Sequence, residues 1–253
     1  MLHYREEGAA NKETILFLHG GGLSGSMWTE VADRMSDYHC LIPDLPEHGR
    51  SSQPQLTMDH CVAELELLLQ GRERVHLVGL SLGGAVALRL MQKQPANIKS
   101  ALISGTAAGI SKLLAAVLNA ATVPMYGLLS AERLANMTMK SFRIPERYRA
   151  EVLADSRCMN VGVVKRMNNM LTEIKLPAVN DKPLLVLTGA HETGPAKRAA
   201  RTIVDKVPRS KGAIVPESGH VWSYENPELF ADVIRQWIDG SRIHPHLLPF
   251  TSP

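Results

Sequence analysis

The chain of 253 residues is 45% hydrophobic and 21% charged, a composition that is typical of a soluble globular protein and excludes the disordered and fibrous classes. Its formal charge is only +3, and no dense run of Lys and Arg interleaved with aromatic residues marks a nucleic-acid surface. Three widely spaced cysteines without a C-x-x-C pair, Cys40, Cys61 and Cys158, predict neither a disulfide framework nor a zinc site, and we expect reduced thiols in a cytoplasmic protein.

The first 105 residues alternate strands with helices. The N-terminus MLHYREEG carries charges where a secretory signal has its apolar segment, and it indicates a strand instead. Runs of β-branched and aromatic residues predict four more strands at residues 14–18, 40–45, 74–80 and 98–104, and helical patterns lie between them at 28–35, 58–69 and 83–94. Strands that alternate with helices predict a parallel sheet that is covered on both faces.

After Gly105 the alternation stops, and residues 106–180 show helical periodicity without a convincing strand. We interpret this segment as an inserted helical cap whose helices are broken at Pro124, Pro145 and Pro177. Its most apolar stretch, residues 113–129, is interrupted by polar residues and is shorter than the ~20 apolar residues that a membrane span requires. No membrane span is therefore expected.

Two kinds of residue are frequent in the cap. Six of the eleven methionines fall there, at Met125, Met137, Met139, Met159, Met167 and Met170. They fit either a flexible lid over an apolar pocket or ordinary packing of helices. The basic residues Lys140, Arg143, Arg147, Arg149, Lys165 and Arg166 are also prominent. They fit either solvated helix faces or a preference for anionic substrates.

The strand and helix alternation resumes after the cap. Strands are expected at residues 182–189 and 211–217, with helices at 196–207 and 227–238, and residues 241–253 form a tail that looks irregular. The sequence therefore predicts a doubly wound, mostly parallel α/β sheet. It is built from residues 1–105 and 181–240, with the cap at 106–180 and the tail at 241–253.

The segment Gly79-Leu80-Ser81-Leu82-Gly83 fits the pattern G-x-S-x-G between a predicted strand and a predicted helix. In this context the pattern predicts a nucleophilic serine at a sharp, strained turn. The two glycines lack the side chains that would collide with the adjacent strand and helix.

With this motif the sequence resembles the α/β-hydrolase fold superfamily over nearly its whole length. The segment HGGGLSGSMW (residues 19–28) is similar to the family's oxyanion loop, DLPEHGRS (44–51) to its D-x-x-G-x-G-x-S turn, and SGHVWSYENPELF (218–230) to the stretch that carries the catalytic histidine. One departure is Glu47, which stands where that turn usually has glycine. The departure concerns the local backbone conformation and not the chemistry.

A serine hydroxyl needs a positioned imidazole to accept its proton as it attacks. His220 follows the last long predicted strand, where the resemblance places this base. The resemblance places the acid after the strand that ends at Gly189, which indicates Glu192, and glutamate is a permitted variant of the usual aspartate. Glu217 is the competing acid because it is close to His220 in sequence, whereas residues 105–109, a second family position, hold no carboxylate.

The remaining histidines have other expected roles. We expect His19 to brace the adjacent glycine loop, and we expect His48, His76 and His191 to be solvated or satisfied polar positions.

Two backbone N–H groups aimed at the developing oxyanion are expected to complete the site. Leu82 offers one because it follows the nucleophile, and the resemblance places the other at Gly21, with Gly22 as the second candidate. A phosphate-binding loop is the alternative interpretation of HGGG. It would need a Lys-Ser/Thr pair or the full G-x-G-x-x-G pattern, and the segment has neither. No metal and no organic cofactor is implied.

The resemblance implies hydrolysis of an ester or lactone of a small apolar substrate through an acyl-enzyme on Ser81. Relatives that cleave haloalkanes or epoxides use aspartate in place of this serine, which counts against those activities. The alternatives are a carbon–carbon hydrolase, a hydroxynitrile lyase or a perhydrolase on the same triad, or a ligand receptor with slow turnover. We expect the protein neither to bind nucleic acid nor to span a membrane. The sequence carries no signal for the oligomeric state.

Overall fold

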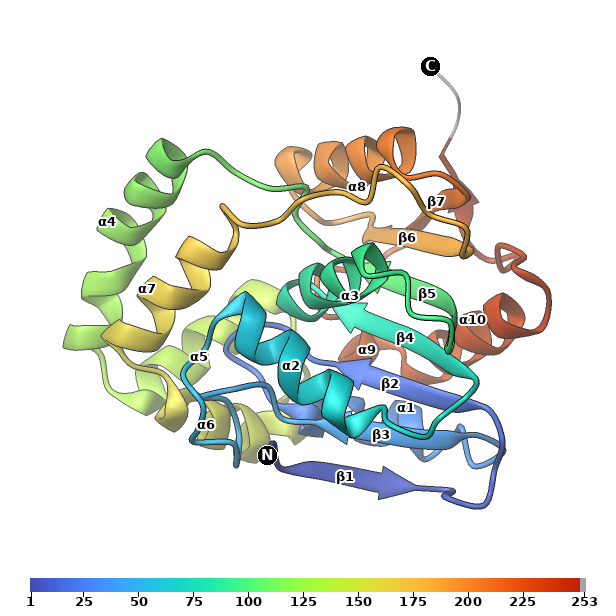
Figure 1. The fold of residues 1–253 in the computed structure, drawn as a ribbon. Helices are drawn as coiled ribbons and strands as arrows, with labels where there is room; N and C mark the ends of the chain where they lie inside the picture. The colour runs from blue at the N-terminus through green and yellow to red at the C-terminus, as the bar shows by residue number, and fades with distance from the viewer. Residues whose placement is uncertain (251–253) are drawn as a thin grey trace.

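A computed structural model describes residues 1–250, and an eight-stranded sheet forms its centre (Figure 1). The strands are β1 (Tyr4–Glu7), β2 (Thr14–Leu18), β3 (His39–Pro43), β4 (Val75–Leu80), β5 (Ile98–Ser104), β6 (Leu184–Gly189), β7 (Ser210–Val215) and β8 (Leu248–Pro249). They lie in the order β1-β3-β2-β4-β5-β6-β7-β8. Strands β2 to β7 run parallel, and the edge strands β1 and β8 pair antiparallel with β3 and β7. The predicted doubly wound, mostly parallel sheet is confirmed.

Helices cover both faces of the sheet. One face packs against α2 (Met58–Leu68), α3 (Leu82–Gln92) and α8 (Gly194–Lys206), and the other packs against α1 (Thr29–Ala32), α9 (Trp222–Glu225) and α10 (Pro227–Gly240). Successive strand residues point to opposite faces. In β2, Ile15 and Phe17 join the core beside α1 and α10, whereas Leu16 and Leu18 join the core beside α2 and α3. The continuous apolar run TILFL thus reflects a strand that is buried on both faces.

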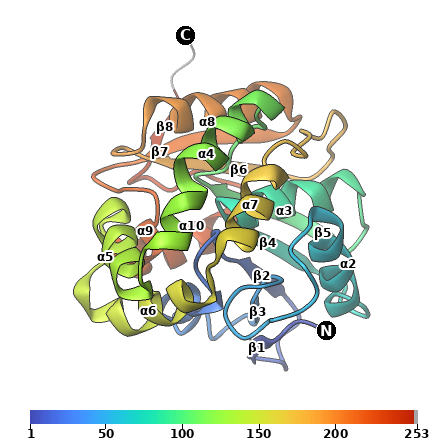
Figure 2. The same cartoon turned by 90° about the vertical axis from the view of Figure 1, so that its left-hand side faces the viewer.

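Four helices occupy the chain between β5 and β6, which is the segment that we call the cap (residues 106–180). They are α4 (Lys112–Leu128), α5 (Ala131–Phe142), α6 (Arg149–Cys158) and α7 (Val161–Met170), with a short 3-10 helix at Glu146–Tyr148. Helix α4 packs on α7, and α5 packs on α6. The cap lies at the edge where the parallel strands end, and Figure 2 shows α4 and α7 in front of that edge. Residues at the carboxyl ends of β2, β4, β6 and β7 are therefore the ones that face it.

The expected helix break at Pro124 is wrong, because α4 continues through this residue. Proline removes the hydrogen bond to the carbonyl of Ala120, four residues earlier. Ala120 belongs to an exposed stretch of the helix, where solvent replaces the lost partner. Pro145 and Pro177 lie between elements, as expected.

The structure also corrects the C-terminal tail and the first helix. Residues 248–249 form β8, in which Leu248 pairs with Ile214 of β7, so the tail is not wholly irregular. An edge strand tolerates Pro249 because its outer side needs no N–H donor. The helix expected at 28–35 is shorter, since a 3-10 turn (Gly25–Trp28) precedes the four residues of α1. Throughout residues 1–250, no helix has both the length and the apolar character needed to cross a membrane.

Candidate active site

Ser81 lies at the sharp turn between β4 and α3. Its backbone has φ +52° and ψ −110°, a strained conformation for a residue with a side chain. The flanking glycines make the turn sterically possible. A Cβ atom at Gly79 would lie 2.7 Å from the carbonyl oxygen of Gly83, and one at Gly83 would collide with the carbonyl oxygens of Leu18 and His19. The strand-turn-helix context expected for G-x-S-x-G is therefore present.

His220 and Glu192 meet through a hydrogen bond at the same edge of the sheet. Nδ1 of His220, in the loop after β7, lies 2.8 Å from Oε2 of Glu192, in the loop after β6. The other carboxylate oxygen, Oε1, accepts from the N–H of Gly189 at 3.1 Å and from the hydroxyl of Thr188 at 3.3 Å. The Glu192 side chain is only 3% exposed. These bonds fix the carboxylate, which in turn fixes the orientation of the imidazole ring.

Neither of the two competing acid positions supplies a carboxylate to His220. Gly105, the first residue after β5, has φ +61°, and a Cβ atom there would lie 2.5 Å from Cε1 of His220. A carboxylate side chain has no room at that position. Glu217 is exposed, and within residues 1–250 it forms no hydrogen bond with His220.

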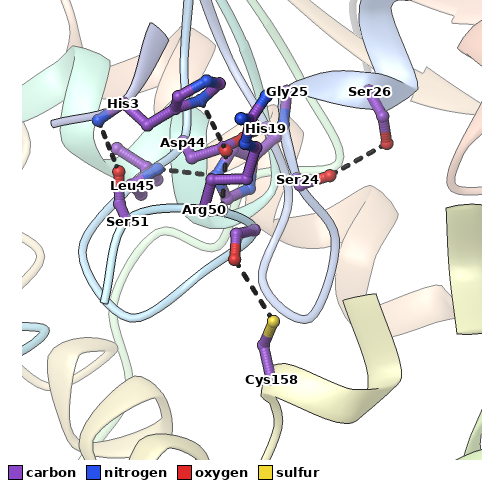
Figure 3. Close-up of polar contacts among 11 residues, drawn as sticks. His3, His19, Ser24, Gly25, Ser26, Asp44, Leu45, Arg50, Ser51 and Cys158 are labelled. Carbon is purple, nitrogen blue, oxygen red and sulfur yellow. Dashed lines mark hydrogen bonds and ion pairs between the residues drawn. The ribbon is translucent and has the colours of Figure 1, made fainter. Parts of the chain in front are cut away.

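His19 braces the glycine loop that follows β2, as expected, and Figure 3 shows its bond to Leu45. Its Nε2 accepts a hydrogen bond of 2.8 Å from the N–H of Leu45, so Nδ1 carries the proton and donates to the carbonyl of Gly20 at 2.8 Å. Burial, reinforced by the neighbouring His48 ring 5.1 Å away, lowers the pKa of His19 to about 3. The ring is therefore neutral and links the loop after β2 to the loop after β3.

The turn at residues 44–51 is tied to the same loop by Asp44 (Figure 3). Its Oδ1 accepts from the N–H of Gly25 at 2.8 Å, and its Oδ2 accepts from the N–H of Arg50 at 2.9 Å. His3 of the edge segment contacts the same Oδ2 through Nδ1 at 3.2 Å and donates its backbone N–H to the hydroxyl of Ser51. The role of this turn is thus structural, because Asp44 holds two loops and the N-terminal segment together.

Glu47, the departure from the family pattern, adopts the backbone conformation that glycine would favour. Its φ is +60°, in the left-handed region that costs a non-glycine residue free energy. Its carboxylate forms a bidentate pair with Arg166 of α7, with oxygen to nitrogen distances of 2.6 and 2.8 Å, and it accepts from the N–H of Leu56. Such paired, charge-assisted bonds are among the stronger polar contacts in proteins. They connect the turn to the cap and offset the strain.

Three further histidines, His48, His76 and His191, match the expectation of solvated or satisfied positions. His48 is buried beside His19, with Nδ1 bonded to a backbone carbonyl, and burial lowers its pKa. His76 is also buried, with its two ring nitrogens bonded to Ser100 and Glu13. His191 is exposed.

A cavity of about 200 Å³ lies between the strand ends and the cap. The core contributes Gly20, Gly21, Leu23, Leu80, Ser81, Leu82, His220 and Val221, and the cap contributes Phe142, Met167, Asn168 and Leu171. Ser81 and His220 therefore line one cavity, and Glu192 holds the His220 ring through the hydrogen bond to Nδ1. A Cβ atom at Gly21 would collide with the Met167 sulfur, so the cap closes tightly over the glycine loop. Within residues 1–250, no cluster of three His, Cys, Asp or Glu side chains is placed to hold a metal ion.

Comparison with known proteins shows which family the chain belongs to. A family model described as "Alpha/beta hydrolase family" matches residues 15–233. The chain belongs to the alpha/beta hydrolase family. It is 27% identical to an "AB hydrolase superfamily protein" of Gibberella zeae, across 92% of this chain and 84% of that protein. It is also 27% identical to "Lipase 3" of a Moraxella species, across 94% of this chain and 81% of the lipase.

Solved structures share the fold of this alpha/beta hydrolase. A thermophilic esterase from Thermogutta terrifontis superposes with a TM-score of 0.78 at 20% identity, and the match covers 95% of this chain and 93% of the esterase. At this level of identity the likeness concerns the fold alone. It includes the cap, because the matched residues extend over nearly all of both chains.

The alpha/beta hydrolase contains a second cavity, of about 330 Å³, between α6 and the loops that follow β2 and β3. Ser24, Asp44, Asp155 and Cys158 line it, and the Cys158 thiol donates to the carbonyl of Gly49 at 3.3 Å (Figure 3). Asp155 of α6 is 4% exposed, and its Oδ2 has no hydrogen-bond partner. Burial, with a smaller contribution from the nearby Asp44 carboxylate, raises the pKa of Asp155 to about 7.

We expect this buried acid to make the hydrolase less stable as pH rises. The unfolded chain releases the Asp155 proton near its ordinary pKa of 3.8, whereas the folded chain keeps it until about 7. The folded state therefore binds more protons between these values, and its stability falls as pH rises through that window. Between pH 5 and pH 8 the loss is about 3 kcal/mol at about 1.4 kcal/mol per pKa unit. Urea unfolding at the two pH values should show this loss in the wild type and not in Asp155→Asn, and parallel pH profiles for the two proteins would contradict it.

Several lining residues of the first cavity were not predicted as site residues. The centre of the Phe142 ring lies 5.2 Å from that of the His220 ring, with the two planes tilted by 32°. Asn168 is the polar residue that the cap brings into the cavity. The sequence places Met167 among the six cap methionines that could line a pocket. Nothing in the sequence separates it from the other five. The position of each depends on how α5 and α7 pack, which a local pattern does not encode.

Proposed function

We propose that this protein is a serine hydrolase that cleaves a carboxylic ester or lactone of a small apolar substrate through an acyl-enzyme on Ser81. The observation that carries the proposal is the bond of 2.8 Å between Glu192 and His220, beside a cavity that His220 and Ser81 line together. The names of the relatives, a lipase and an esterase, support ester hydrolysis as the class of reaction.

Each group has a defined task in the proposed reaction. Because Nδ1 of His220 faces the Glu192 carboxylate, that nitrogen carries the proton and Nε2 is the free base. Nε2 removes the hydroxyl proton as the Ser81 oxygen attacks the ester carbonyl, and the imidazolium then gives this proton to the leaving alcohol. Water enters, loses a proton to Nε2 and attacks the acyl carbonyl. The bond from the carbonyl carbon to the Ser81 oxygen then breaks, that oxygen takes the proton from Nε2, and the acid is released. Glu192 stabilises the imidazolium and stays ionised throughout.

The oxyanion that forms at each step needs hydrogen-bond donors to stabilise its negative charge. Leu82 is the first residue of α3, and the first N–H groups of a helix have no partner within the helix. We assign its N–H as one donor and the N–H of Gly21 as the other. Both residues line the cavity, and glycine at position 21 leaves room for the Met167 sulfur, with which a Cβ atom there would collide. Two such donors contribute about 3 kcal/mol each to stabilising the transition state.

The size and lining of the cavity restrict the acyl group. Its volume of about 200 Å³ lies below the ~300–1,000 Å³ of a typical ligand pocket. Leu23, Phe142, Met167 and Leu171 make most of the wall apolar. We therefore propose short aliphatic acyl groups as the preferred substrates, with the cap as the element that limits their length.

The test is a series of p-nitrophenyl esters with acyl chains of two to ten carbons, assayed in the wild type and in Met167→Ala. We expect the wild type to prefer the shortest esters. Met167→Ala removes the side chain that closes the cavity over Gly21, so its kcat/KM ratio of long to short esters should rise about tenfold, the value of one or two buried methylene groups. Met137→Ala is the matched control, because Met137 is an exposed cap methionine outside the cavity.

Two outcomes would count against the proposal. No turnover of any ester, together with tight binding of a small ligand, would indicate a receptor. An identical shift in Met137→Ala would show that the cap responds as a whole, and that Met167 does not set the acyl length.

A further inference from the structure

Helix α4 directs apolar side chains into solvent. Leu113, Val117 and Leu128 are 76%, 56% and 82% exposed. At 100° per residue these positions fall within about 60° of one another around the helix, and the stripe is about 22 Å long. No charged residue occurs from residue 113 to residue 128. The stripe is therefore continuous and uncharged.

The polar side chains of α4 point the opposite way, toward α7. Asn119 accepts from Asn168 and donates to Asn169, each at 3.0 Å, and the hydroxyl of Thr122 accepts from Asn168 at 3.0 Å. A helix on a water-facing surface normally buries its apolar side and exposes its polar side. Here the polar side is used to hold α4 on α7, and the apolar side is left outside.

The apolar surface extends from α4 onto the start of α7. A Cβ atom at Gly127 would lie 3.3 Å from the Val161 side chain, which is itself 42% exposed. We define the outer patch as Leu113, Leu114, Val117, Leu128 and Val161. Figures 1 and 2 show α4 as the helix of the cap that lies farthest from the sheet. The exposed fractions of the five side chains place the patch on the outside of the molecule.

Positive charge accompanies the patch. Residues 106–180 contain ten Lys and Arg against five Asp and Glu, a net charge of +5, whereas the rest of the chain has 18 against 20 and is slightly acidic. Lys112 begins α4 directly before Leu113, and Lys165 lies one helical turn after Val161. Both lysines are exposed, and neither pairs with a carboxylate within residues 1–250.

We propose that the outer patch docks the cap onto an anionic lipid surface. The apolar side chains enter the boundary between headgroups and acyl chains, and Lys112 and Lys165 contact the lipid phosphates. A second copy of the chain fits less well, because a symmetric contact through this patch would bring Lys112 and Lys165 of one copy close to the same lysines of the other. The docking does not depend on the chemistry proposed for Ser81.

The test is sedimentation with vesicles of phosphatidylcholine alone or with phosphatidylglycerol. The wild type should bind the mixed vesicles more tightly than the neutral ones, and 0.5 M salt should weaken the difference because it screens the lysines. The double variant Leu113→Gln with Val117→Gln should bind mixed vesicles at least tenfold more weakly, since one fully buried aliphatic side chain is worth about tenfold. The matched control is Leu67→Gln with Val179→Gln, two exposed apolar residues outside the patch that are 54% and 67% exposed.

Charge reversal and the oligomeric state complete the test. Lys112→Glu with Lys165→Glu should reduce binding to mixed vesicles and leave binding to neutral vesicles unchanged. Equal binding by the patch variant and the control variant, at equal thermal stability, would overturn the proposal. A dimer in light scattering that the patch variant converts to a monomer, without vesicle binding by the wild type, would assign the patch to self-association instead.

Discussion

Replacing Ser81 by alanine is expected to lower kcat by roughly a millionfold without unfolding the protein. Only the hydroxyl oxygen is lost, and the backbone demand at φ +52° is the same for alanine as for serine. The residual rate is expected to come from the proposed oxyanion donors and the cavity, which alanine leaves intact. The measurement is kcat on p-nitrophenyl acetate, with thermal unfolding to confirm the fold.

A fluorophosphonate probe identifies the reacting atom independently of turnover. It should add one equivalent to the wild type and to Ser52→Ala, an exposed serine close in sequence to the turn at residues 44–51. Ser81→Ala should take up none. Labelling that persists in Ser81→Ala, or turnover within tenfold of the wild type, would move the nucleophile to another residue.

The parts of the fold that local patterns encode were predicted closely. The strand at residues 98–104 has the predicted bounds, because the run IKSALIS is buried along most of its length and flanked by a proline and a glycine. The turn around Ser81 was also predictable, since G-x-S-x-G combines a nucleophile with the two positions where a Cβ atom does not fit. In such segments the sequence of a few neighbouring residues is enough to determine the backbone.

The parts that depend on distant contacts were predicted poorly or not at all. Pro124 breaks no helix, because an exposed carbonyl finds water in place of its helical partner. Strand β8 exists because Phe250 lies against Gly212 of β7, a contact between segments about 40 residues apart. The burial of Asp155 and the outward direction of the apolar side of α4 both depend on how the cap packs. Hydrophobic periodicity shows that α4 is a helix, but not which side it presents to the core.

The assignment of the acid predicts a large effect at Glu192 and a negligible one at Glu217. Glutamine at position 192 keeps an oxygen for the N–H of Gly189, but it places an amide N–H2 group opposite Nδ1 of His220. Two donors then face each other, so the imidazole shifts its proton to Nε2, and the nitrogen that faces the cavity loses its basic lone pair. We expect kcat to fall by roughly ten thousandfold, as for other triads in which the wrong tautomer is imposed, with KM less affected.

Three variants measured on one activated ester decide the assignment, once thermal unfolding shows that each is folded. Glu192→Gln should be severely impaired, whereas Glu217→Gln should match the wild type because Glu217 is exposed and does not contact His220. Glu192→Asp should keep intermediate activity, since the shorter side chain retains the charge but ends about 1.5 Å farther from the ring unless the loop moves. A nearly active Glu192→Gln beside an inactive Glu217→Gln would reverse the roles of the two carboxylates. Equal, small losses in both would mean that His220 acts without a carboxylate partner, and the bond of 2.8 Å would then serve only to hold the two loops together.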